Sequence, residues 1–232
     1  LMATNSPMSA APSLNKSISY DPVKDFTGLS RVGSFTFMLT INKDVPAQKL
    51  RELIAHAKAN PGKLSHASGN SSGVVAGETF KTAAGLDILH VPYRSAPPAM
   101  NDLIAGRVSM FFGSISTLNP QVQNGRLRSI AVTTLTRSST IPEIPTFVES
   151  GYAGFEVNGW YGLLGPAKMP PAVVARLNGE LQKVLADADT QTRFAANGME
   201  PAPGSAAAFG ERIRNEIAKW GQVVRAAGIR PE

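Results

Sequence analysis

Hydrophobic and polar positions along this chain recur with two periods, one typical of strands and one typical of helices. Residues 35–41 (FTFMLTI) are mostly aromatic, branched or apolar, which predicts a buried strand. From Pro46 to Asn60 the apolar positions recur about every 3.6 residues, and the segment starts with a proline that a first helical turn tolerates. This second segment is therefore predicted to be an amphipathic helix with one face against the core.

Strand-like and helix-like segments alternate over the rest of the chain. Strands are predicted at residues 64–67, 87–91, 108–112, 127–134 and 155–164. Helices are predicted at residues 73–84, 97–105, 171–185 and 206–227. Such alternation through short connections is typical of an α/β fold with a mostly parallel sheet. The opening LMATNSP reads as the end of a strand whose beginning lies upstream.

Composition narrows the classes of protein that fit this pattern. The chain has 232 residues, of which 43% are hydrophobic, enough for a globular core. It contains no apolar run of about 18 residues and no cysteine, so we expect neither a membrane span nor disulfide or thiolate chemistry. The net charge of +6 favours anionic partners, but Lys and Arg are scattered without interleaved aromatic residues, so we expect no nucleic acid partner.

A small-residue loop carries the candidate chemistry. Gly69-Asn70-Ser71-Ser72-Gly73 matches the G-x-S-x-G pattern of a serine hydrolase, with Ser71 as nucleophile. In α/β-hydrolases the acid and then the histidine follow the serine at a distance, whereas here His90 is the last histidine and lies three residues after Asp87. A hydrolase is therefore kept as the alternative, and the residues argue against it.

Two further interpretations of residues 68–73 stay open. Ser and Asn at a helix start can cap it by accepting hydrogen bonds from first-turn amides. A run of hydroxyls and amides at that position can also bind an anion, because ligands of open α/β sheets lie beyond the carboxyl ends of the strands. Ser114 follows another predicted strand and has the same two interpretations. The three histidines show no metal-ligand spacing, so we expect no metal and no cofactor.

Several motifs together resemble one known family. They are ASGNSSG at 67–73, HVPYRSAPPAM at 90–100, DLIAG at 102–106, LRSIAVT at 127–133, IPT at 144–146, ESG at 149–151 and GPA at 165–167. In this combination they are similar to the Bug-type (TctC-like) solute receptors of tripartite tricarboxylate transporters. The resemblance extends over essentially the whole chain.

The resemblance implies a fold and a function. Such receptors are periplasmic, are not enzymes, act with membrane transporter subunits, and have a two-lobed periplasmic-binding-protein fold of type II-like topology. The lobes close on a small carboxylate, an organic acid or an acidic amino acid, and the expected protein is a monomer. Here the first lobe would comprise residues 1–40 and 160–232, without its N-terminal strand and helix, and the second lobe residues 41–159.

The resemblance also indicates ligand contacts. In this family, loop amides and small hydroxyl side chains hold the carboxylate. The expected contacts in this chain are Thr4, Asn5, Ser68, Gly69, Asn70, Ser71, Ser72 and Ser114.

Overall fold

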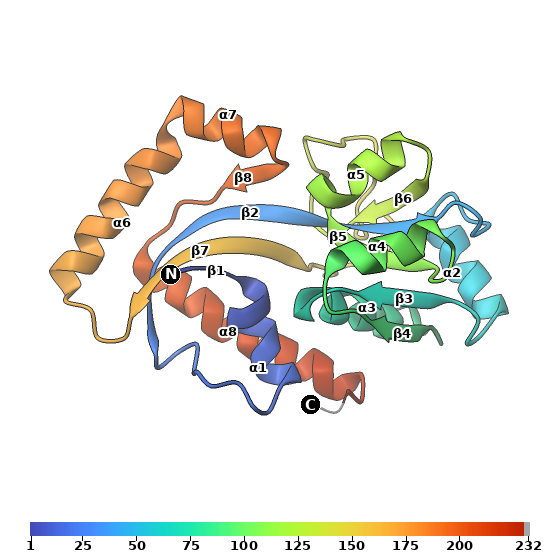
Figure 1. Cartoon of the computed structure of the whole chain (residues 1–232), viewed down its shortest axis with the longest axis horizontal. Coiled ribbons are helices and arrows are strands. Elements are labelled where there is room, and N and C mark those ends of the chain that lie inside the picture. The colour runs from blue at the N-terminus through green and yellow to red at the C-terminus, as the bar shows by residue number, and fades with distance from the viewer. Residues whose placement is uncertain (230–232) are drawn as a thin grey trace. The chain divides into compact units, whose positions relative to one another are not determined.

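A computed structural model describes residues 1–229, and the chain divides into two compact units (Figure 1). The first unit comprises Leu1–Phe35 and the residues from Gly159 onward, and the second comprises Thr36–Asn158. Strand β2 (Phe26–Asn42) contributes its first half to the first unit and its second half to the second. The α/β fold class predicted from the sequence is confirmed.

The second unit is built on a sheet with strand order β4-β3-β5-β2-β6. Its other strands are β3 (Ser65–Ser68), β4 (Leu89–Pro92), β5 (Met110–Ser114) and β6 (Leu127–Val132). Strand β3 is parallel to β4 and β5, whereas β2 is antiparallel to both β5 and β6. The predicted mostly parallel sheet is thus confirmed for β3 to β6, and β2 is the reversed strand among them.

Helices cover both faces of this sheet. They are α2 (Leu50–Ala59), α3 (Ser71–Ala84), α4 (Ala96–Ile104) and α5 (Ile115–Gln123). Successive strand side chains point to opposite faces. Accordingly, Phe111 belongs to the core that includes residues of α4 and α5, whereas Phe112 packs edge-on against Phe80 of α3. On the α3 side, Phe147 stacks on Phe155 with ring centroids 4.0 Å apart.

The first unit has a smaller sheet with the order β1-β7-β2-β8. Its strands besides β2 are β1 (Met2–Thr4), β7 (Asn158–Pro166) and β8 (Met199–Pro201). Its helices are the π-helix η1 (Ser6–Ala10), α1 (Ala11–Leu14), α6 (Pro171–Ala186), α7 (Ala188–Ala196) and α8 (Ala206–Ala226). Trp160 is fully buried, packs edge-on against Phe209 of α8, and donates its Nε1–H to Glu216 at 2.8 Å.

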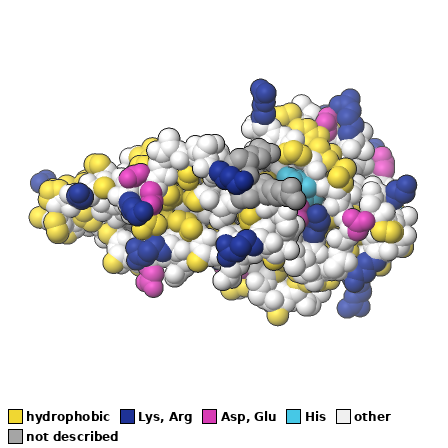
Figure 2. All heavy atoms as spheres, turned by 90° about the horizontal axis from the view of Figure 1, so that it is seen from below, with side chains coloured by type: hydrophobic (Ala, Val, Ile, Leu, Met, Phe, Trp, Pro, Cys, Tyr) yellow, Lys and Arg dark blue, Asp and Glu magenta, His cyan; other side chains and the backbone are white. Residues whose placement is uncertain are grey.

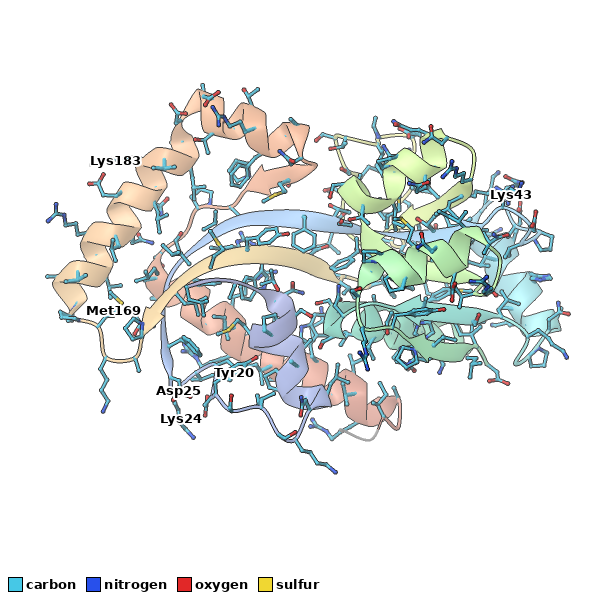
Figure 3. All side chains as sticks on the ribbon, viewed as in Figure 1. Tyr20, Lys24, Asp25, Lys43, Met169 and Lys183 are labelled. Atoms are coloured by element: carbon cyan, nitrogen blue, oxygen red, sulfur yellow. The ribbon has the colours of Figure 1, made fainter. Side chains whose placement is uncertain are left out.

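Helix α6 forms at the predicted residues, but most of its apolar face is not buried. Its apolar stripe is typical of a helix that faces the core, yet only Leu185 is buried, while Val173 and Leu177 remain 43% and 37% exposed. On the ribbon, α6 and α7 form an arm of the first unit, and the side chain of Lys183 points outward from it (Figure 3). The helical period thus predicts the helix correctly, but it does not show how much of the apolar face is buried.

Basic side chains, apolar helices and metal-ligating residues can also be located in the described part of the chain. On the face drawn in Figure 2, Lys and Arg side chains are scattered rather than gathered in a stripe. Within residues 1–229, no helix has the length and apolar content that crossing a membrane requires. Over the same residues, His, Asp and Glu form no group of three that could hold a metal ion.

Candidate functional site

The loop between β3 and α3 leads into the helix start that carries the G-x-S-x-G pattern. Asn70 is the N-cap of α3, and its side-chain Oδ1 accepts a hydrogen bond from the amide of Gly73 at 2.9 Å. The amide of Val74 donates to the carbonyl oxygen of Asn70 at 3.2 Å. Ser71 is the first helical residue, whose amide has no acceptor within a helix. The capping interpretation is therefore confirmed for Asn70, and anion binding by the loop stays a prediction.

The loop residues differ in accessibility. Asn70 is exposed and Ser71 is half-buried, whereas Ser68 and Ser72 are only 2% and 1% exposed. A Cβ on Gly69 would lie 2.5 Å from the amide nitrogen of Ala96, so only glycine lets the loop approach the start of α4 this closely. A ligand that reaches this loop from solvent would therefore meet Asn70 and Ser71 first.

Ser114 ends β5, the strand next to β3 in the sheet. Because the two strands are parallel, with Ala67 opposite Phe111, the ends that carry Ser68 and Ser114 lie at the same edge of the sheet. Ser114 is the N-cap of α5 by position, but its hydroxyl contacts the hydroxyls of Thr117 at 2.7 Å and Ser116 at 3.2 Å instead of a backbone amide. The fold thus brings Ser114 to the edge that carries the loop.

The two candidates in the first unit lie next to each other in the chain. Thr4 ends β1, where it is paired with Tyr161 of β7. Asn5 follows at the N-cap position of η1 and is 1% exposed. Both remain predicted ligand contacts.

A buried polar cluster beneath the loop was not predicted. His66 of β3 contacts Glu78 of α3 through Nε2 and Oε1 at 3.1 Å, and its ring stacks on that of His90 with centroids 4.7 Å apart. His90 Nε2 lies 2.7 Å from the hydroxyl oxygen of Ser68. Glu78, 3% exposed, also pairs with Lys81 at 3.1 Å. In the sequence, the only signal was the spacing of His66 and Ser68, which places both on one face of a strand.

This cluster also bears on the hydrolase alternative. The serine of the loop region that contacts a histidine is Ser68, not the candidate nucleophile Ser71. The carboxylate of Glu78 contacts His66 rather than His90, so Ser68, His90 and Glu78 do not form the serine–histidine–acid chain of a hydrolase.

Burial and neighbouring charges shift two ionisable groups of the cluster. Burial lowers the pKa of His90 from 6.5 to about 4; electrostatic interactions with His66 and Lys81 act in the same direction, and the interaction with Glu78 opposes them. Burial would raise the pKa of Glu78, but hydrogen bonds from His66 and Lys81 outweigh it and hold this pKa below its usual value. At neutral pH, His90 is therefore neutral and Glu78 is ionised.

The shift at His90 predicts a loss of stability on mild acidification. The unfolded chain takes up a proton near pH 6.5, whereas folded His90, with its lowered pKa, does so only near pH 4, so lowering the pH through this window favours unfolding. We expect His90 to reduce the free energy of unfolding by about 1 to 2 kcal/mol between pH 7 and pH 4, less than the full shift implies because the ring is partly solvated. Urea titrations at several pH values would measure it.

The matched variant is His90→Gln, which cannot titrate. Its stability should fall less between pH 7 and pH 4 than that of the unaltered chain. If the free energy of unfolding falls equally with pH in both proteins, His90 does not cause this pH dependence.

Known proteins are similar to this chain in both sequence and fold. Residues 1–229 match the family described as tripartite tricarboxylate transporter family receptor (TctC). The UPF0065 protein in the tcbD-tcbE intergenic region of Pseudomonas sp. (strain P51) is 32% identical over 210 residues. That alignment covers 89% of this chain and 62% of the relative, so the chain spans less than two thirds of the relative's length.

Two solved structures are similar to the whole chain. One is R. palustris Rpa4515 with adipate, which is 29% identical with a TM-score of 0.91, over 100% of this chain and 78% of that one. The other is the periplasmic binding protein BugD, which is 31% identical with a TM-score of 0.86, over 100% of this chain and 79% of that one. The similarity in sequence and fold is therefore to binding proteins.

Proposed function

The chain belongs to the tripartite tricarboxylate transporter receptor family, and from this premise we propose that it captures a small carboxylate outside the cytoplasm for a membrane transporter. The receptors of this family bind their solute and do not transform it, so the chain is not an enzyme. The observation that carries the proposal is the start of α3, where an Asn-capped, serine-rich loop lies at the carboxyl end of β3. A helix start attracts a carboxylate through its amides and its partial positive charge.

The chemical class of the ligand is supported by a relative and by the loop itself. The similar R. palustris protein was solved with adipate, a dicarboxylate. In this chain, α3 has no acidic residue in its first turn, so no carboxylate of that turn competes with an incoming one. We therefore propose an organic acid or an acidic amino acid, held by the amide and hydroxyl of Ser71 and by Asn70.

The loop alone would bind weakly. A hydrogen bond to a charged group contributes about 1.5 to 3 kcal/mol, so three of them give about 5 to 9 kcal/mol. Association costs about 4 to 15 kcal/mol. Micromolar affinity, about −8 kcal/mol, therefore needs further contacts. Ser114, and Thr4 and Asn5 of the first unit, are our candidates for them.

Location and partners follow from the family as proposals. We propose that the protein acts in the periplasm as a monomer and presents its ligand to transporter subunits in the membrane. No nucleic acid, metal or cofactor enters this proposal.

A thermal-shift panel tests the proposal. The panel contains adipate, succinate, glutamate, citrate and, as a neutral control, adipamide, and it is applied to the 232-residue chain and to the full product of its gene. An acid at about 100 times its dissociation constant should add about 2.7 kcal/mol, or about 5 to 10 °C in melting temperature for a protein of this size. If no acid raises the melting temperature of the full gene product, the receptor proposal is wrong.

Replacing Ser71 by alanine tests the loop within that proposal. We expect the variant to bind the preferred acid about tenfold more weakly, because one hydrogen bond to a carboxylate is lost while the helix amides remain. Thr82→Ala, at an exposed position of the same helix, should leave the affinity unchanged and serves as the control. Calorimetry would measure both, and equal affinities for the two variants would place the ligand elsewhere.

A further inference from the structure

Ser68 ends β3 directly before the proposed binding loop, and its hydroxyl is already in contact with a histidine. The oxygen lies 2.7 Å from Nε2 of His90, and Ser68 is 2% exposed. Bulk water therefore offers this hydroxyl few alternative partners. The orientation of its proton depends on His90 and on any ligand that reaches the end of β3.

The ring of His90 is held in place by the ring of His66 on the neighbouring strand. His66 and His90 are opposite each other on the parallel strands β3 and β4, and their rings stack with an angle of 14° between planes. His66 is fixed in turn, because its Nε2–H donates to the buried carboxylate of Glu78. Helix α3 approaches this stack closely, since a Cβ on Gly77 would lie 2.2 Å from the ring of His66. The stack fixes the plane of His90 and the position of its Nε2.

A neutral imidazole can hold the serine in two ways. With the proton on Nδ1, Nε2 accepts the Ser68 hydroxyl proton, and the serine offers a ligand only lone pairs. With the proton on Nε2, His90 donates to the serine oxygen, and the serine proton is free to be donated elsewhere. His90 is half-buried and neutral near pH 7, so one of its two ring nitrogens carries the proton and the other does not.

We propose that His90 is a positioning residue for carboxylate recognition: when the ligand binds at the loop, His90 carries its proton on Nε2, and Ser68 donates its hydroxyl proton to the ligand. A carboxylate accepts hydrogen bonds and cannot donate one, so it selects this arrangement. The inference rests on the proposed function, because it names the group that makes Ser68 a donor toward the ligand of that site. His66 and Glu78 act indirectly: Glu78 holds the His66 ring, and His66 holds the His90 ring by stacking on it.

Calorimetry on four variants tests whether His90 and Ser68 contribute to the affinity for the carboxylate. The titrant is adipate, replaced by succinate, glutamate or citrate if one of these gives the larger thermal shift. Ser68→Ala should weaken binding about tenfold or more, since it removes the hydrogen bond that Ser68 donates to the ligand. His90→Leu should also weaken binding about tenfold, since Ser68 loses the Nε2–H donor that orients its hydroxyl toward the ligand. His90→Gln should stay within about threefold of the unaltered protein, because its amide N–H can replace Nε2–H. The double variant His90→Leu/Ser68→Ala should bind no more weakly than either single one.

Nitrogen NMR of the unaltered protein tests the tautomer without any substitution. In protein labelled with ¹⁵N-histidine, addition of the acid should move the Nε2 signal of His90 toward the protonated position and the Nδ1 signal away from it, and adipamide should not. This readout separates positioning from a merely structural role, which would leave the tautomer independent of ligand charge.

The outcomes distinguish the inference from the proposed function. If the full gene product binds an acid, but His90→Leu binds it equally well or the tautomer stays on Nδ1, the inference is overturned and the receptor function stands. If no acid of the panel binds, the proposed function fails and the inference fails with it. Melting temperatures of the ligand-free variants show that each one is folded.

Discussion

Gly77→Ala is expected to reduce the free energy of unfolding by about 2 to 4 kcal/mol, a large loss for the addition of one methyl group. The new Cβ would lie 2.2 to 2.3 Å from two atoms of the His66 ring, far inside van der Waals contact. The ring has little freedom to move, because it is fully buried, bonded to Glu78 and stacked on His90. Either the helix shifts or the buried carboxylate loses a hydrogen-bond donor, and both are costly.

A matched control separates this clash from the effect of alanine on a helix. Gly179 lies inside α6, and a Cβ added there would meet no heavy atom of the described residues within 4 Å, so Gly179→Ala should stabilise the protein by about 0.5 to 1 kcal/mol. Urea unfolding followed by circular dichroism measures both changes. Amide hydrogen exchange should locate the loss in α3 and β3 for Gly77→Ala. A stabilised Gly77→Ala variant would contradict the packing described for His66.

Local sequence patterns predicted the elements whose shape is decided by their own residues. In α2, the apolar positions Leu50, Leu53 and Ile54 are all buried, as the 3.6-residue period requires. Strand β2 extends far beyond the predicted residues 35–41, because its first half becomes a strand through pairing with β7 and β8 rather than through a pattern of its own. For helix α5 only a start was indicated, through Ser114 as a possible cap; its extent was not predicted, and it contains Pro120, a residue that argues against a helix.

Burial could be predicted less well than helical structure. The apolar stripe of α6 exists, but Val173 and Leu177 remain substantially exposed. In α3, the helical period favours an inward-facing Ala83, yet this residue is exposed and its neighbour Ala84 is buried. A period shows that a helix has an apolar face, and it does not show which other element covers that face.

One part of the candidate site could be predicted from the sequence, and another part could not. Residues 68–73 stood out because small polar residues at a helix start have a local physical role, and the capping by Asn70 follows from that role. The contact between Ser68 and His90 could not be predicted, since the two residues lie 22 positions apart and meet only through the register of β3 and β4. The spacing of His66 and Ser68 places both on one face of a strand, but the register that brings His90 next to them leaves no local signal.

Asn70→Asp is expected to weaken binding of the carboxylate about 5- to 150-fold while leaving the fold intact. Aspartate is as good an N-cap as asparagine, so its oxygen should still accept the hydrogen bond from Gly73, and its charge next to the helix start should stabilise the helix by about 0.3 to 1 kcal/mol. The same charge would face a bound carboxylate at about 5 Å, which costs about 1 to 3 kcal/mol for an effective dielectric constant between about 80 and 20.

The result would separate the two roles of the loop, because this substitution changes stability and binding in opposite directions. Calorimetry gives the affinity and thermal melting gives the stability, with Asn70→Ser as the control that keeps a capping oxygen without a charge and should bind within a few-fold of the unaltered protein. Since Asn70 is exposed, the loss of affinity should also shrink as salt is raised from about 0.01 to 0.5 M. An aspartate variant that binds the acid as tightly as the serine variant at low salt would mean that the α3 start caps a helix and does not hold the ligand.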